Sequence, residues 1–214
     1  MIDDLNDWIV VHHFEDHVYA VGAIDIETQW DPTPQQIQPW INAYDAATNH
    51  RAYYFGNALD CPRDLPPTQP QSQSPVNRLC RGSWYQDDVA EASVNHHMFP
   101  LPRKYHTDGR DSDTWYRIGL YNYFDAGSIV DFHGSLTQYF ACLQKGGCDG
   151  ANLYPTTGNN QLYDELNDPY GRVTRSMYFA TDMIWYENGS YQCLYPEDPY
   201  PECTPNCMYE CLDE

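Results

Sequence analysis

Basic residues are scarce in this chain of 214 residues, which has 11 Lys and Arg against 31 Asp and Glu and a formal net charge of −20. Nucleic-acid binding depends on clustered cations that neutralise phosphates, so this shortage argues against nucleic acid as a partner. The same shortage disfavours an anionic membrane surface. Long apolar runs are also missing: stretches such as Ile9-Val10-Val11 are far shorter than the roughly 18 residues of a membrane-spanning helix, so we expect no membrane insertion.

Several sequence signatures are absent as well. There is no GxSxG nucleophile elbow, P-loop or dinucleotide-binding fingerprint, which removes the commonest hydrolase, NTPase and dehydrogenase interpretations, and we expect no cofactor. Met1 to Asp4 carry neither a basic nor an apolar signal-peptide region. His13 and His17 do not fit the HExxH pattern, and we interpret His96, His97 and His133 as exposed loop histidines, so no metal site is predicted.

The residues that are present favour a folded extracellular protein. Hydrophobic residues make up 42% of the chain and aromatic residues 15%, which is enough for a core in spite of the charge. Eight cysteines, most of them beside Pro, Gly or Asn, are typical of disulfides formed in an oxidising compartment. We therefore expect a secreted protein. Asn188-Gly189-Ser190 is a glycosylation sequon that has meaning only in a eukaryote.

The cysteine spacing indicates two local pairings. Cys61 with Cys80 would close a loop rich in Pro, Gln and Ser, and Cys142 with Cys148 would close a short Gly-Gly loop. The remaining four are also disulfide candidates and lie near the C-terminus: Cys193, Cys203, Cys207 and Cys211. A zinc site is the less favoured alternative for these four, because the paired CxxC spacing is missing.

Hydrophobic periodicity predicts an α/β fold. Strands are expected at 18–27, 51–58, 89–95, 118–124 and 129–132, and helices at 2–17, around an inner face of Trp40, Ile41 and Tyr44, and at 161–166. Residues 60–82 are expected to form a loop, and the chain from about 193 an irregular tail. Alternating strands and helices predict βαβ units and a parallel sheet.

Two acids near the end of the first predicted strand are the candidate catalytic pair. Asp25 and Glu27 are two residues apart, so in a strand both side chains project from one face, at the end where α/β folds place their active sites. Two close carboxylates repel one another unless one keeps its proton, which is what a glycosidase acid needs. In the alternative interpretation, one acid caps the next turn and the other pairs with an arginine.

The segment VGAIDIETQW resembles the DxE strand of glycoside hydrolase family 25 lysozymes and of their relatives, the glycoside-hydrolase-like domains of the DUF1906 type. RAYYFGN, VAEASVNHHMFPLPRKY, WYRIGLYNYFDAGSIVDFHGSLTQY and ATDMIW continue the similarity in order over roughly residues 5–186. The resemblance implies that Glu27 donates a proton to the glycosidic oxygen and that Asp25 assists it. It further implies sugar contacts, for which the candidates are Trp30, Tyr53, Tyr54 and Asp131.

The resemblance also sets the expected architecture, which is a partial (β/α)8 TIM-barrel-like domain with about four to five parallel strands over residues 1–190, followed by a Cys- and Pro-rich tail over 191–214. The first strand here matches about the fifth strand of the family pattern, so we expect the C-terminal portion of a longer protein. The expected function is hydrolysis of peptidoglycan or another glycan. Two alternatives stay open: a non-catalytic glycan-binding module, and a Cys-rich extracellular structural protein.

Overall fold

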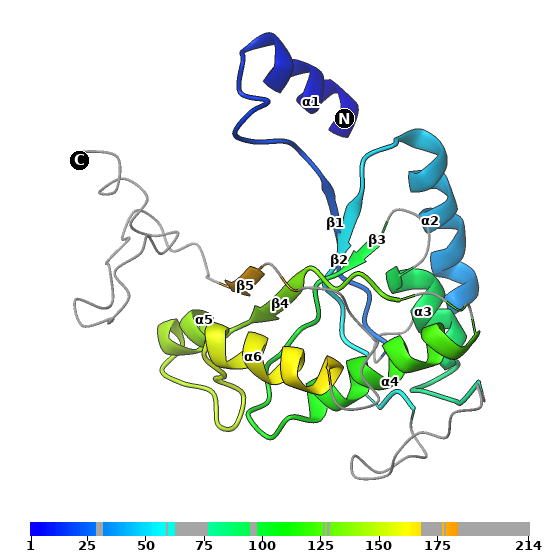
Figure 1. The fold of residues 1–214 in the computed structure, drawn as a ribbon, viewed down its shortest axis with the longest axis vertical. Coiled ribbons are helices and arrows are strands. Elements are labelled where there is room, and N and C mark those ends of the chain that lie inside the picture. The colour runs from blue at the N-terminus through cyan, green and yellow to red at the C-terminus, as the bar shows by residue number, and fades with distance from the viewer. Residues whose placement is uncertain are drawn as a thin grey trace. The chain divides into compact units, whose positions relative to one another are not determined.

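The computed structural model describes residues 1–28, 32–58, 60–62, 77–94, 98–125, 127, 129–167, 177 and 179–183. The chain divides into two compact units, Met1–Ile184 and Trp185–Glu214, and the elements below belong to the first. In chain order they are α1 (Ile2–Val11), β1 (Gly22–Ile24), α2 (Pro34–Ala47), β2 (Ala52–Tyr54), α3 (Gln86–Val94), β3 (Met98–Pro100), α4 (Arg110–Asp125), β4 (Gly134–Thr137), α5 (Tyr139–Gln144), α6 (Pro155–Leu166) and β5 (Phe179–Asp182) (Figure 1).

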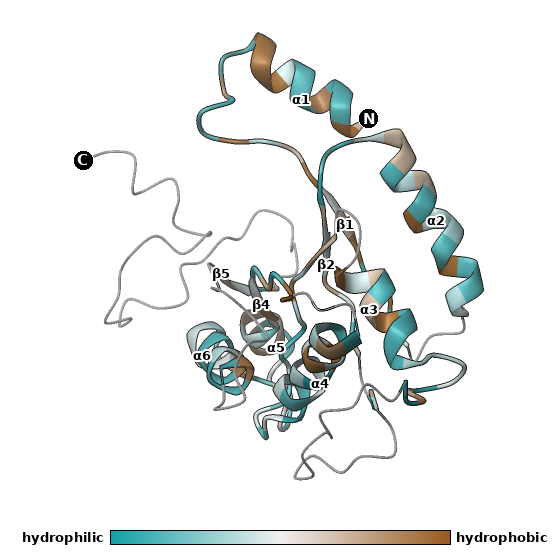
Figure 2. Ribbon diagram, turned by 45° about the vertical axis from the view of Figure 1, so that its right-hand side comes forward, coloured by the Kyte–Doolittle hydropathy of each residue, from teal (hydrophilic) through white to brown (hydrophobic). Residues whose placement is uncertain are grey.

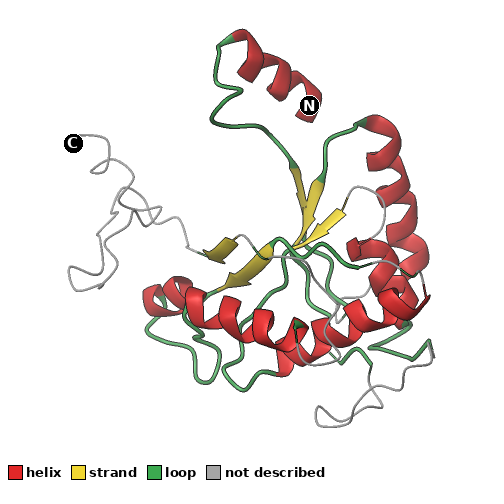
Figure 3. Cartoon of the chain, viewed as in Figure 1, coloured by secondary structure: helices red, strands yellow, loops and turns green. Residues whose placement is uncertain are grey.

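All five described strands run parallel to their neighbours. One sheet has the order β1-β2-β3 and the other pairs β4 with β5. Parallel bonding continues between the sheets just after β3, because Arg103 bridges to Leu136 and the amide of Lys104 donates to the Leu136 carbonyl at 2.7 Å. The strands therefore follow one another in space as they do in sequence, with helices between them (Figure 3). This order confirms the α/β class; the described strands do not close into a barrel.

The helices bury one face of the strands. Helix α3 packs on β3, α6 packs on β4 and β5, and α4 lies against both α3 and α6. The largest fully buried side chains of this core include Trp84, Trp115, Tyr54, Phe132 and Ile118. Helix α1 differs, because most of its apolar side chains are exposed. Figure 2 shows that both hydrophobic and hydrophilic residues occur along this helix. It is linked to the rest of its unit by polar contacts, such as the two hydrogen bonds between Asn6 and the backbone of Ala20.

The predicted strand at 89–95 is wrong, because its described residues, 89–94, belong to helix α3. The buried side chains of α3 include Gln86, Val89, Ala90 and Ser93, which follow the i, i+3, i+4, i+7 spacing of a helix. Asp87 and Asp88 occupy the first turn, where their negative charges interact favourably with the positive end of the helix dipole. The strand follows immediately at Met98–Pro100.

The strand predicted at 118–124 is also wrong, since helix α4 covers it. Aromatic and β-branched residues are common in strands, but here Trp115 and Ile118 form part of a helical stripe that packs into the core. The strand predicted at 129–132 begins later, at Gly134. The other predicted strands are present but shorter: 18–27 contains Gly22–Ile24, and 51–58 contains Ala52–Tyr54.

Two of the three predicted helices are close to expectation. The predicted helix at 161–166 is the end of α6, and the helix around Ile41 is α2, in which Gln36 accepts a hydrogen bond from the Thr33 backbone amide at 2.8 Å. Ile41 is fully buried as predicted, but Trp40 is 42% exposed and does not belong to the inner face. The third helix, predicted at 2–17, ends at Val11.

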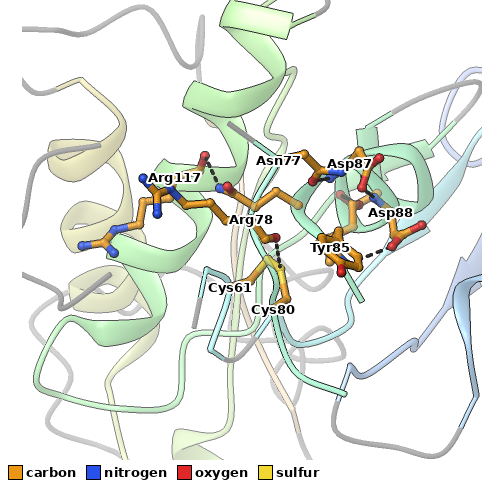
Figure 4. Close-up of a disulfide and its surroundings, with 11 residues drawn as sticks. Cys61, Asn77, Arg78, Cys80, Tyr85, Asp87, Asp88 and Arg117 are labelled. Carbon is orange, nitrogen blue, oxygen red and sulfur yellow. Dashed lines mark hydrogen bonds between the residues drawn. A yellow bond between two sulfur atoms is a disulfide. The ribbon is translucent and has the colours of Figure 1, made fainter. Parts of the chain in front are cut away.

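Both local disulfide predictions are confirmed. Cys61 pairs with Cys80 at a Cα–Cα distance of 4.2 Å, and Cys142 pairs with Cys148 at 5.2 Å. Figure 4 shows the first pair beside the start of α3, where the Cys80 Sγ lies 3.9 Å from the Arg78 carbonyl oxygen. Both disulfides fit an oxidising compartment. The four cysteines predicted near the C-terminus lie outside the described residues.

Candidate functional site

Asp25 and Glu27 directly follow β1 at the carboxyl end of the parallel strands. Two contacts to the neighbouring strand hold the segment between them: the Tyr54 hydroxyl donates to the Ile26 carbonyl at 2.7 Å, and Gly56 passes close to the same carbonyl. A Cβ on Gly56 would lie 1.9 Å from that oxygen, so only glycine allows the two strand ends to approach this closely. The acids are thereby held on a fixed backbone.

Arg103 joins the two acids. It follows β3, and its guanidinium forms an ion pair with Glu27 and lies 3.6 Å from Asp25 Oδ1. The Glu27 side chain is 2% exposed and that of Asp25 is 29% exposed. A buried carboxylate is costly unless a cation neutralises it, and Arg103 does this for Glu27. Pairing with an arginine, the alternative considered from sequence, is therefore present at this position.

The two acids differ in their electrostatic surroundings. Burial raises the pKa of Asp25, and the nearby Arg103 charge opposes that rise only in part. Asp25 Oδ1 is buried and accepts no hydrogen bond from the described residues. Asp25 is therefore a partly exposed acid that holds its proton to a higher pH than an ordinary aspartate. Glu27 is buried and forms its ion pair with Arg103.

Two further groups lie at the same edge. Arg103 stacks over the ring of Tyr105, with its guanidinium carbon 4.3 Å from the ring centroid. Burial is the main cause that raises the pKa of Tyr105, and Asp25 and Asp182 both add to the rise. Asp182, the last residue of β5, accepts hydrogen bonds from the backbone amides of Tyr139 and Phe140 at 2.8 and 2.6 Å. The site thus collects residues from the ends of three strands.

Arg103, Tyr105 and Asp182 were not predicted as site residues. Arg103 and Tyr105 were placed in a loop after a misassigned strand, so their position at a strand end was hidden. Asp182 lies in the ATDMIW segment that contributed to the family resemblance, and it ends β5, whereas Asp25 directly follows β1. An acid at the carboxyl end of a parallel strand is the signal that could have identified it.

The predicted sugar contacts fall in different places. Tyr54 is fully buried against Trp115, so its ring is part of the core and offers no surface to a ligand. Tyr53 is partly exposed, and its hydroxyl lies 3.1 Å from His133 Nδ1. Asp131 Oδ2 lies 3.6 Å from His133 Nε2. Trp30 lies outside the described residues.

Metal and membrane chemistry receive no support from this part of the chain. The described residues contain no group of three or more His, Cys, Asp or Glu side chains placed to hold a metal ion. Among the helices that the structure describes, none has the length and apolar character needed to cross a membrane.

Comparisons with known proteins add no assignment. No family model, curated protein or solved structure matches this chain. The geometry at the ends of β1, β3 and β5 is therefore the basis for any functional proposal.

Proposed function

We propose that this chain is a secreted glycoside-hydrolase-like domain that acts on peptidoglycan or another glycan, and that its parallel strands form part of a (β/α)8-type barrel. The observation that carries the proposal is the Asp25–Arg103–Glu27 group at the carboxyl end of the strands. Glycosidic cleavage requires one carboxylic acid that donates a proton and one carboxylate that stays ionised. The group supplies two carboxyls in two different environments.

The structure favours a different division of roles from the one that the family resemblance implies. Glu27 is paired with Arg103 and almost completely buried, which suits a carboxylate that stays charged. Asp25 is more exposed and has a raised pKa, which suits a proton donor to a leaving-group oxygen. In the proposed mechanism Asp25 donates its proton to the leaving-group oxygen as the glycosidic bond breaks, and the ionised Glu27 stabilises the positive charge that develops at the anomeric carbon. A water molecule then adds to that carbon and returns a proton to Asp25. Arg103 fixes the separation of the two acids.

The test is hydrolysis of a panel of glycans that includes purified peptidoglycan, chitin and acidic plant polysaccharides, followed by reducing-end release. We expect wild-type protein to cleave at least one of them. Loss of a general acid typically costs about 10²–10⁴-fold in rate, so Asp25→Asn should lower cleavage by that factor. Glu27→Gln should lower it too, and a thermal melt establishes whether that variant is folded.

Asp164→Asn is the matched control, because this exposed acid on α6 undergoes the same chemical change away from the site. It should leave cleavage unchanged. If wild-type protein binds glycans but releases no reducing ends, the chain is the non-catalytic binding module. If it neither binds nor cleaves any glycan of the panel, the proposal is wrong.

A further inference from the structure

The sheet that ends beside Asp25 also carries an aromatic cluster that the proposed catalysis does not use. Tyr53 is in register with Ala23 on one side and with Phe99 on the other, so the three side chains share one face. Asp25 comes two residues after Ala23 in sequence, just beyond the end of β1. The cluster therefore lies on the same three-stranded sheet that leads to the proposed general acid.

Ring contacts hold the cluster together. The Phe99 ring stacks on the His133 imidazole with a centroid distance of 3.7 Å, and the Tyr53 ring lies 6.1 Å from Phe99. The hydrogen bond between the Tyr53 hydroxyl and His133 Nδ1 fixes the orientation of the tyrosine. Tyr19, which is 70% exposed, acts electrostatically on Tyr53 and therefore lies close to it. Phe99 itself is buried, whereas Tyr53 and His133 are partly exposed. Fixed, partly exposed rings provide flat apolar surfaces with polar edges.

Arg51 adds a positive charge to this surface. It precedes Tyr53 by two residues, and its guanidinium carbon lies 4.0 Å from the Phe99 ring centroid. Its charge acts on the cluster, because it opposes the burial-induced rise in the pKa of Tyr53 and contributes to the lowered pKa of His133, for which burial is the main cause.

Within the described part of the chain, Arg51 differs from four other arginines in its surroundings. No carboxylate of the described residues lies within ion-pair distance of it, although the sequence holds 31 acids. Arg81, Arg103, Arg110 and Arg117 each have such a carboxylate. Asp131, the acid that lies beside the cluster, interacts with His133 through its Oδ2, which lies 3.6 Å from His133 Nε2. The guanidinium at this aromatic surface is therefore available to an anion from outside.

We infer that Arg51, Tyr53 and His133, supported by the buried Phe99 ring, form a binding surface for a carboxylated sugar. The carboxylate pairs with the Arg51 guanidinium, whose planar fork suits that group, while the apolar face of the pyranose packs on Tyr53. The inference rests on the proposed function and narrows it to acidic glycans. Such a carboxylate can belong to a uronic acid or to the lactyl ether of a muramic acid, and both place the charge beside a pyranose ring.

The experiment measures binding by calorimetry at low salt, using Asp25→Asn protein so that cleavage does not consume the ligand. One ligand pair is oligogalacturonate and its methyl ester, and the other is N-acetylglucosaminyl-N-acetylmuramic acid and chitobiose. We expect at least a tenfold preference for the acidic member of one pair, and that pair identifies the source of the carboxylate. Arg51→Gln should abolish the preference, while Tyr53→Ala should weaken the binding of both members of the pair.

Arg81→Gln is the matched control, because it removes the same charge from another exposed arginine, which pairs with Asp60 and lies outside the cluster. It should retain the preference. Equal affinity for the members of both pairs, equal effects of Arg51→Gln and Arg81→Gln, or no binding of any ligand would overturn the inference.

Two results separate this inference from the proposed function. If wild-type protein cleaves neutral glycans in an Asp25-dependent way and shows no acidic preference, hydrolysis stands and the carboxylate site is wrong. If Arg51-dependent binding occurs and wild-type protein cleaves nothing, the site stands and hydrolysis is wrong.

Discussion

Lys104 shows how one residue can carry an unfavourable charge inside this fold. Its side chain is fully buried, and its Nζ donates to Gln161 Oε1 at 3.0 Å. Burial lowers the pKa of Lys104 to about 8, although Asp111, Asp108 and Glu165 oppose the shift. The ammonium is therefore less stable in the native state than in the unfolded chain.

The sign of the pH dependence follows from proton binding. Between pH 8 and the ordinary value of 10.5, the unfolded chain holds a proton on Lys104 that the native protein has lost, so the free energy of unfolding rises with pH. Lowering the pKa from 10.5 to about 8 corresponds to about 3 kcal/mol. Urea unfolding measures the difference in the free energy of unfolding between wild-type protein and Lys104→Met. This difference should rise by that amount between pH 8 and 10.5 in favour of the wild type, and it should stay constant below pH 8. A constant difference across the whole range would contradict the assigned pKa.

For Asp25 we expect the opposite pH dependence, a contribution to stability that falls as pH rises. Its pKa is raised by burial, so protonated Asp25 is retained to a higher pH than in an ordinary aspartate. Any cleavage that needs this proton should fall as pH rises through the raised pKa, and the stability that Asp25 contributes should be lost over the same interval. Carbon-13 titration of the Asp25 carboxyl should show a midpoint above 3.8. A midpoint at or below 3.8 would remove Asp25 as the proton donor.

At the scale of elements, the site depends on how closely the ends of β1 and β2 approach. Gly56→Ala introduces a Cβ at 1.9 Å from the Ile26 carbonyl oxygen, a backbone atom that cannot rotate away. The expected loss of stability is about 1–3 kcal/mol, the usual range for overpacking, together with a displacement of the segment that carries Asp25 and Glu27. Thermal unfolding and the Asp25 carboxyl shift measure the two effects separately.

Gly146→Ala is the comparison for this change. Gly146 has a φ of 86°, and an added Cβ would meet no atom within 4 Å, so the substitution strains the local backbone alone. It should lower stability by about 1 kcal/mol and leave the chemical shift of the Asp25 carboxyl unchanged. If Gly56→Ala also leaves the Asp25 carboxyl shift unchanged, the close approach of the strand ends does not position the site.

At the scale of the whole molecule, the net charge of −20 is the dominant feature. Like charges repel more strongly in the compact native state than in the extended chain, and salt screens this repulsion. The free energy of unfolding should therefore rise as sodium chloride increases from 10 to 200 mM in urea titrations.

A charge-reduced variant tests the cause of that rise. Four exposed acids away from the site can be replaced by their amides: Asp7, Glu15, Asp16 and Asp164. This variant should be more stable at 10 mM salt and depend less on salt. An identical salt dependence in both proteins would show that the rise does not come from the surface charge.

Much of the architecture follows from sequence because local chemistry decides it. Both local disulfides were predicted from cysteines beside turn-forming residues, and the parallel α/β class from apolar runs that alternate with helical patterns. Asp25 and Glu27 were located correctly after a strand, because two acids after a buried run are conspicuous. The assignment of α3 as a strand failed because a short apolar run fits either period, and packing against β3 and α4 selected the helix.

The sequence alone therefore determines the acidic, disulfide-bonded α/β character of this protein and the position of its two conspicuous acids, since these depend on composition and on residues close together in the chain. Only the tertiary structure decides that Arg103 neutralises Glu27, that burial raises the pKa of Asp25, and that Tyr54 belongs to the core while Tyr53 is partly exposed. These properties depend on burial and on the distance between charges, and segments far apart in sequence set both.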